Sequence, residues 1–252
     1  MPFSISMSGS SDMRIAILVT NTDDSVFAHA WPDDGEKFAD LLHIARPDWR
    51  CDTFWVCRDS FPDDIAAYDG AMITGSPASV NDRTPWMLRL EELIRDMIAA
   101  RQPLFGACFG HQVIAAALGA PIVANPAGWG HGLLSVRRGQ PTPWAGVEKG
   151  FALYGSHMEQ VGAVPEGATV VFEGPDCPVA GFALGDTVMT VQHHPEMTHD
   201  FMNALVEFYA DEVGAEATER ARASLTREAD QAAFAEEIAR FFEHAAARGG
   251  AA

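Results

Sequence analysis

The stretch Pro103-Leu104-Phe105-Gly106-Ala107-Cys108-Phe109-Gly110-His111-Gln112 decides the fold predicted for this chain. A short apolar run ends at Gly106, a cysteine follows at Cys108, and an alanine-rich pattern with helical spacing begins near Gly110. This order predicts a buried strand, a sharp turn and a helix, with a nucleophilic residue at the turn. It is the cysteine form of the G-x-S-x-G elbow. A Cβ atom at Gly106 or Gly110 would collide with the neighbouring strand or helix, which explains both glycines.

The helix predicted after Cys108 gives this cysteine a special environment. Its free N–H groups and positive dipole end point at the sulfur, which favours the thiolate. The same N–H groups are available to a developing oxyanion. The alternative is a buried cysteine in an ordinary strand-to-helix turn, and the elbow taken alone leaves both interpretations open.

Strand and helix patterns alternate before the elbow. The predicted strands are 14–20, 51–56 and 69–74, and the predicted helices are 35–45 and 85–100. This alternation predicts an α/β domain with a parallel sheet, right-handed crossovers and helices on both faces. Chemistry in such sheets collects at the carboxyl ends of the strands, where both Cys108 and the turn 74–80 lie. That small, glycine-containing turn either supplies a second amide donor facing the one after Cys108 or is a plain turn.

Short apolar runs follow the elbow between residues 121 and 191. They are 121–124, 133–136, 169–172, 179–184 and 187–191, and turns such as Gly185-Asp186 join them. They predict antiparallel strands added to the parallel core. The glycine-rich segment 128–132, which carries Trp129, is interpreted as a loop that lines a pocket or turns a corner.

A second chemical stretch, 191–196, closes the last of these strands with the residues Gln192-His193-His194-Pro195-Glu196. Side chains alternate along a strand, so His193 and His194 point opposite ways and one of them can reach Cys108. A carboxylate at Glu196 is placed to hold one ring nitrogen of His194, which leaves the other free to take a thiol proton. A metal site at His193, His194, Glu196 and His199 is the weaker alternative, because the spacing matches no zinc pattern and Pro195 interrupts it.

Composition restricts the class of partner. The 252 residues carry a formal net charge of -18, with 17 Lys+Arg against 35 Asp+Glu, which argues against nucleic acid and anionic membranes as partners.

The cysteines Cys51, Cys57, Cys108 and Cys177 form no C-x-x-C pair, which favours a reducing compartment. Residues 1–12 lack the pattern of a signal peptide and no run reaches the length of a membrane span. We therefore expect a cytoplasmic protein.

Four motifs together resemble the class I, triad-type glutamine amidotransferases. They are the elbow 106–112, the late stretch 192–196, the turn 73–80 and the segment Ser156-His157-Met158-Glu159-Gln160-Val161 with its continuation 165–168. They occur in family order over roughly residues 14 to 210. Two positions depart from the family pattern: Ser76 replaces the usual second glycine, and Glu159 stands where aspartate is usual.

The resemblance implies a flavodoxin-like α/β/α sandwich with a mostly parallel sheet, added antiparallel strands and C-terminal helices. It implies Cys108 as nucleophile, His194 as general base and acid, and Glu196 as its orienting carboxylate. The N–H groups of Ser76 and Phe109 would form the oxyanion hole. The implied substrate-binding residues are Gly75, Gln112, Ser156, His157, Met158 and Glu159. We expect no cofactor and no metal.

The resemblance leaves the amide's leaving group open. We expect either an autonomous hydrolase of glutamine or another γ-glutamyl compound, or a glutaminase subunit that delivers ammonia to a separate synthetase. A non-catalytic glutamine-binding module is the weakest alternative, because all three triad residues are present. The expected partner is a small γ-glutamyl molecule, and a homo-oligomer or a synthetase partner would dock through the C-terminal helices.

The expected organisation is a flexible tail at 1–13, the amidotransferase domain at 14–212 and a helical extension at 213–252. The extension carries an apolar stripe at Phe234, Ile238, Phe241 and Phe242. We interpret this stripe as core packing in preference to a partner site.

Overall fold

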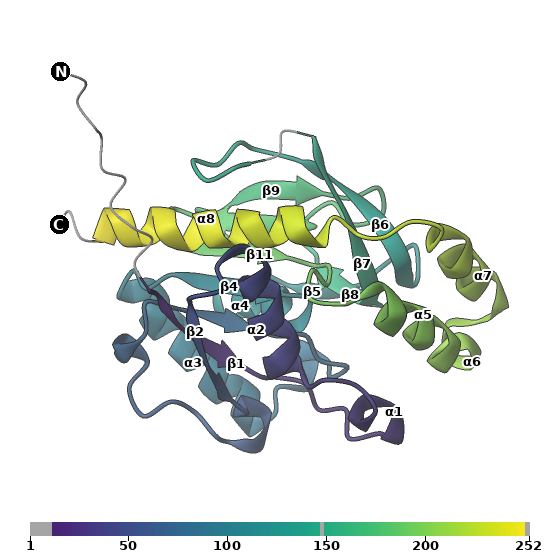
Figure 1. The fold of residues 1–252 in the computed structure, drawn as a ribbon, viewed down its shortest axis with the longest axis horizontal. Helices are drawn as coiled ribbons and strands as arrows, with labels where there is room; N and C mark the ends of the chain where they lie inside the picture. Colours follow the sequence, from purple (N-terminus) through teal and green to yellow (C-terminus); the bar gives the residue numbers. More distant parts are fainter. Residues whose placement is uncertain (1–11, 147–148, 250–252) are drawn as a thin grey trace.

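The computed structural model describes residues 12–146 and 149–249. Within these ranges a sheet of nine strands crosses the molecule in the order β2-β1-β3-β4-β11-β10-β9-β6-β7, and a small sheet pairs β5 with β8 (Figure 1). The strands are β1 Arg14–Leu18, β2 Arg50–Phe54, β3 Gly70–Ile73, β4 Leu104–Ala107, β5 Ile122–Ala124, β6 Gly130–Arg138, β7 Gly150–His157, β8 Glu159–Val161, β9 Thr169–Glu173, β10 Gly181–Leu184 and β11 Val188–Val191.

The sheet has a parallel half and an antiparallel half. Strands β2, β1, β3, β4 and β11 pair in parallel, whereas β11-β10, β10-β9, β9-β6 and β6-β7 pair antiparallel. Strands β1, β3 and β4 are buried almost throughout, which matches their continuous apolar sequences. The parallel half with its helices confirms the predicted α/β, flavodoxin-like architecture.

Helices cover both faces of the parallel half. The α-helices are α1 Val26–His29, α2 Asp34–Ala45, α3 Pro85–Ala99, α4 Phe109–Ala117, α5 His199–Phe208, α6 Ala210–Val213, α7 Ala215–Ser224 and α8 Gln231–Gly249. Helix α2 begins at a capping box, in which the Asp33 carboxylate accepts from Glu36 N–H and the Glu36 carboxylate accepts from Asp33 N–H. Helices α3 and α4 pack on one face of the sheet, and α2 and α8 pack on the other.

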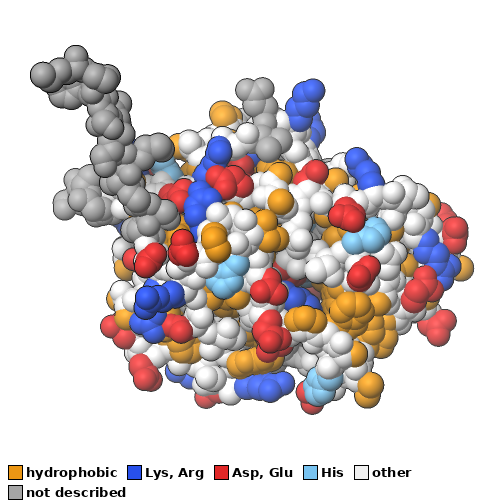
Figure 2. Space-filling view, viewed as in Figure 1, with side chains coloured by type: hydrophobic (Ala, Val, Ile, Leu, Met, Phe, Trp, Pro, Cys, Tyr) orange, Lys and Arg blue, Asp and Glu red, His pale blue; other side chains and the backbone are white. Residues whose placement is uncertain are grey.

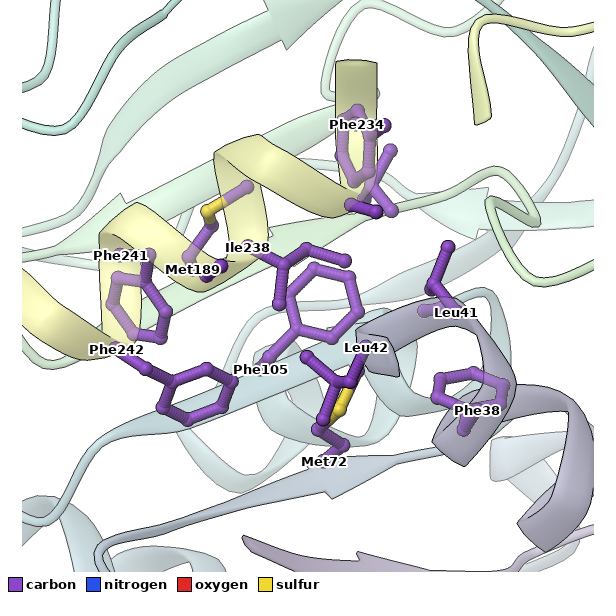
Figure 3. Packing of buried hydrophobic residues seen from close by; sticks show 14 of the residues in the cluster. Phe38, Leu41, Leu42, Met72, Phe105, Met189, Phe234, Ile238, Phe241 and Phe242 are labelled. Atoms are coloured by element: carbon purple, nitrogen blue, oxygen red, sulfur yellow. The ribbon is translucent and has the colours of Figure 1, made fainter. Parts of the chain in front are cut away.

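The C-terminal helix α8 is part of the main core. Figure 3 shows its side chains facing those of α2 across β3, β4 and β11. Phe234, Ile238, Phe241 and Phe242 are fully buried in this cluster, so the apolar stripe predicted from sequence packs in the core. The domain boundary at residue 212 stays a prediction.

Some elements differ from the sequence-based expectation. The segment predicted as a glycine-rich loop at 128–132 is in part strand, because Gly130, His131 and Gly132 begin β6 and pair with the end of β7. Strands β7 and β8 were not predicted, and neither was the short helix α1. The tail predicted at 1–13 lies outside the described residues except for Asp12 and Met13, and Met13 is buried in the core. Within the described ranges, the helices lack the combination of length and apolar character needed to cross a bilayer.

Candidate active site

Cys108 lies at the turn between β4 and α4 in a strained backbone conformation. Its φ of 51° and ψ of -107° are rare for a residue with a side chain, and its N–H donates to the Val191 carbonyl at 2.9 Å. A Cβ at Gly106 would lie 2.6 Å from the Gly110 backbone, and one at Gly110 would overlap the Ile73 carbonyl oxygen. The two glycines therefore allow the close packing of strand, turn and helix that the elbow needs.

The turn after β3 faces the elbow. Gly110 N–H donates to the Thr74 carbonyl at 3.1 Å, and a Cβ at Gly75 would lie 2.7 Å from His194 Cε1 and 3.7 Å from Cys108 Cβ. The side chain of Ser76 accepts from Ala78 N–H, and Ser76 lines the same cavity as Cys108. Phe109 is the first residue of α4, where backbone N–H groups have no partner within the helix.

His194 is oriented by Glu196. Its Nδ1 donates to Glu196 Oε1 at 2.6 Å, since a carboxylate only accepts, and both side chains are buried. The ring lies beside the Cys108 side chain, since a Cβ at Gly75 would approach both His194 Cε1 and Cys108 Cβ. Burial lowers the pKa of His194, but the negative charges of Cys108 and Glu196 outweigh burial and raise this pKa well above its ordinary value. The site therefore favours the imidazolium form of His194 beside Cys108.

His193 points away from this assembly. Its ring packs edge-on against His157 at a centroid distance of 5.9 Å, and it lines a separate cavity that contains Cys177. Burial, together with the neighbouring histidines, holds the pKa of His193 well below its ordinary value. The adjacent histidines thus lie on opposite sides of the chain, and His194 is the one beside Cys108.

A cavity of about 340 Å³ opens over Cys108, and we call it the glutamyl cavity. It is lined by Ser76, Pro77, Ala78, Ser79, Cys108, Gln112, Trp129, Ser156, His157, Met158, Glu159, Tyr209 and Glu212. Every residue predicted from sequence to bind substrate lines it except Gly75, which lies beneath His194 and Cys108. Trp129, Tyr209 and Glu212 are lining residues that sequence reasoning did not assign; only the aromatic in the segment 128–132 gave a signal.

The polar groups of the glutamyl cavity hold one another in place. Gln112 Nε2 donates to the Glu159 carbonyl at 2.8 Å and to Gln192 Oε1 at 3.2 Å. The Glu159 carboxylate accepts from Ser79 Oγ at 2.7 Å and from Asn81 Nδ2 at 3.1 Å. Glu159 therefore braces the turn after β3 against β8 with the same carboxylate that lines the cavity.

The other cysteines are in different environments. Burial raises the pKa of Cys51 to about 11 and that of Cys177 to about 12, and it also raises the pKa of Cys57. All four thiols are free. Within the described ranges, histidine, cysteine and carboxylate side chains form no group of three or more that could hold a metal ion.

Comparisons with known proteins identify relatives of this chain. A family model described as "Glutamine amidotransferase class-I" matches residues 49–209. Gamma-glutamyl peptidase 3 of Arabidopsis thaliana is 28% identical over 192 residues, which are 73% of this chain and 72% of the relative. GMP synthase [glutamine-hydrolyzing] of Porphyromonas gingivalis is 29% identical over 143 residues, which are 56% of this chain and 27% of that protein. A solved glutamine amido transferase from Methylobacillus flagellatus superposes with a TM-score of 0.72 at 25% identity, covering 94% of each chain.

The fold and the match over 49–209 define a glutamine amidotransferase-type hydrolase domain. This chain belongs to the class-I glutamine amidotransferase family. Its relatives support hydrolysis of a glutamine-type amide as the general reaction.

Proposed function

We propose that this chain is an autonomous cysteine hydrolase that cleaves the side-chain amide of a γ-glutamyl compound through a thioester on Cys108. The observation that carries the proposal is the nucleophile, base and orienting carboxylate assembled within one chain. Cys108 lies at the strained elbow, His194 lies beside it, and Glu196 holds His194 at 2.6 Å. A hydrolase that works alone must supply all three groups from its own chain, and this chain does.

The chemistry follows from the positions of these groups. The Cys108 thiolate attacks the γ-carbonyl carbon, and the N–H groups of Ser76 and Phe109 bind the oxyanion. Protonated His194 gives its proton to the leaving nitrogen as the carbon–nitrogen bond breaks, which leaves a thioester. Water, deprotonated by His194, then hydrolyses the thioester, and Glu196 stabilises the imidazolium that forms.

The glutamyl part of the substrate occupies the glutamyl cavity. Gln112, Ser156, His157, Met158 and Glu159 line it beside the nucleophile. Gly75 serves the site differently, since its missing side chain lets His194 approach Cys108. Pro77, beside Ser76 in the turn, restricts the backbone there and favours an oxyanion hole that exists before substrate binds.

A glutaminase subunit for a separate synthetase is the second candidate. The match to GMP synthase [glutamine-hydrolyzing] favours it. This chain covers 27% of that protein, so the synthetase part would have to be supplied by another chain. Such a subunit would be slow alone and would gain activity when its partner docks.

A substrate panel on the isolated protein separates the two functions. We expect glutamate release from at least one of glutamine, glutathione and a set of γ-glutamyl amines, and loss of that release in Cys108→Ala. Turnover abolished by Cys108→Ala supports the hydrolase. No turnover on the whole panel, with a thioester trapped on Cys108 by mass spectrometry, would support the synthetase-dependent subunit instead.

A further inference from the structure

A second cavity, of about 190 Å³, lies beside the glutamyl cavity, and we call it the aromatic cavity. His194 and Glu196 form part of its wall, whereas Cys108 and Gln112 belong to the wall of the glutamyl cavity. The two cavities share Ser76, Pro77, Ser156 and Tyr209 in their linings, so they adjoin at the catalytic assembly. A substrate that spans both would place its scissile amide between Cys108 and His194.

Aromatic rings from distant parts of the chain line this cavity. Phe27 lies on α1, Trp31 follows that helix, and Phe201 lies on α5. The ring of Trp31 meets Phe201 edge-on at a centroid distance of 5.3 Å, and Phe27 lies 5.8 Å from Phe201. Figure 2 shows hydrophobic side chains gathered on this part of the surface, between the places of α1 and α5 in Figure 1.

The size of the cavity suits a six-membered ring. A buried apolar cavity of about 150 Å³ is large enough to bind benzene. The aromatic cavity has about 190 Å³, far more than the ammonia released from glutamine would occupy. Aromatic walls gain most when they stack on another ring.

The charged groups of the aromatic cavity are mostly carboxylates. Its lining includes Asp23, Asp33, Asp34 and Glu196 against Lys37, Arg58 and the protonated ring of His194. Glu196 already holds His194, and the other two cations are engaged as well. Lys37 Nζ donates to Asp34 at 2.9 Å and lies 4.0 Å from the centre of the Phe201 ring, and Arg58 lies over Trp55 at 4.5 Å. A carboxylate in this cavity would meet net repulsion, whereas a neutral or cationic group would not.

The position of His194 determines which part of the substrate occupies the aromatic cavity. The leaving nitrogen must lie beside His194 to receive its proton, so the body of the leaving amine extends into the cavity that His194 lines. We propose that the aromatic cavity is a leaving-group subsite for an aralkylamine without a carboxylate, which makes γ-glutamyl aralkylamides the preferred substrates. This inference rests on the proposed hydrolase function. On cleavage the carbon–nitrogen bond breaks, the proton of His194 passes to the nitrogen, and the free amine leaves.

Three substrates test the subsite. They are glutamine, γ-glutamyl-phenethylamide and γ-glutamyl-phenylalanine; the last two differ only by the carboxylate on the leaving group. We expect kcat/KM for the phenethylamide to exceed the values for both other substrates by about tenfold or more. Equal values for the phenethylamide and glutamine would overturn the aromatic subsite. Equal values for the phenethylamide and the phenylalanine compound would overturn its charge selectivity.

Variants of the cavity wall separate binding of the ring from general damage. Trp31→Ala should lower kcat/KM about tenfold more for the phenethylamide than for glutamine, and Trp31→Phe should restore most of the difference. Phe61→Ala is the matched control, because Phe61 is a half-buried aromatic outside both cavities. Asp23→Asn with Asp33→Asn keeps the local hydrogen bonds and should narrow the preference for the phenethylamide over the phenylalanine compound severalfold. Equal losses on all substrates in Trp31→Ala would contradict the subsite.

A binding measurement separates failure of this inference from failure of the proposed function. Phenethylamine should bind Cys108→Ala protein in a calorimetric titration, Trp31→Ala should weaken that binding about tenfold, and 3-phenylpropanoate should bind at least about tenfold more weakly. Binding of the amine without turnover of any substrate would support the subsite and overturn the autonomous hydrolase. Turnover of glutamine without binding of the amine would support the autonomous hydrolase and overturn the subsite.

Discussion

At the scale of single residues, adjacent side chains have separate duties. His194 is buried beside Glu196 and Cys108, while His193 packs against His157 and faces a different cavity. Strand alternation predicts this divergence from sequence alone. The turn after β3 and the elbow could also be predicted from the sequence, because both contain glycines. In the structure, Gly75, Gly106 and Gly110 each lie where a Cβ would meet another chain segment.

Replacing each histidine by alanine should therefore give opposite results. We expect His194→Ala to lower kcat about 10²–10⁴-fold or more, because it removes the proton donor and acceptor. His193→Ala should instead lower the unfolding temperature, because it leaves a cavity, and keep most of the turnover. Steady-state kinetics and thermal unfolding of both variants check this. A reversed pattern would show that His193 is the group that serves Cys108.

Other residues of the site were beyond sequence reasoning. Trp31 and Phe201 meet across the aromatic cavity although about 170 positions separate them in the chain. Neither carries a motif, and each on its own is typical of a surface or core aromatic. The pairing depends on where α1 and α5 come to lie, which periodicity does not specify.

At the scale of elements, prediction succeeded where hydrophobic residues recur at a regular helical or strand spacing. The stripe on α8 repeats at helical spacing, and it packs in the core as interpreted. Strand β7 was missed because it is buried on both faces along most of its length and ends in Gly155-Ser156-His157, so it shows no alternation. The start of β6 was missed because glycines at 130 and 132 are typical of a loop.

Helix α8 is also joined to β6 by a buried ion pair. Arg138 on β6 donates to Glu237 on α8 at 2.8 Å, and the two side chains are 7% and 0% exposed. Glu237 also accepts from Gly146 N–H at 2.9 Å. Glu237→Ala removes one carboxylate partner of the buried Arg138 and the acceptor of Gly146 N–H, and it should lower the free energy of unfolding by about 1.5–3 kcal/mol.

An exposed pair of the same kind is the control. Glu216 pairs with Arg220 one turn away on α7, and the Glu216 side chain is 92% exposed. Glu216→Ala should cost no more than about 0.5 kcal/mol, because water screens the pair. Urea unfolding of both variants gives the comparison. Similar small losses in the two would show that the buried pair does not hold α8 to the sheet.

At the scale of the whole molecule, the fold buries several neutral histidines. Burial lowers the pKa of His111 to about 3 and those of His131 and His157 to about 4, and it lowers that of His193 as well. The unfolded chain binds protons at these positions below about pH 6.5, whereas the native state does not. Stability therefore falls as the pH decreases through this range. His194 acts oppositely, since its raised pKa gives stability that is lost as the pH rises through the raised value.

The two effects together predict maximal stability near neutral pH and a steep loss on the acid side. Between about pH 6.5 and 5, each buried histidine should remove at most about 1.4 kcal/mol of unfolding free energy per pH unit, before ordinary carboxylates are protonated. Urea unfolding at half-unit intervals measures the slope. His111→Asn should reduce the slope by about one histidine's share. Stability that stays level or rises towards pH 5 would mean that the native state binds these protons. That result would contradict the lowered pKa values, because burial disfavours the charged form of each histidine.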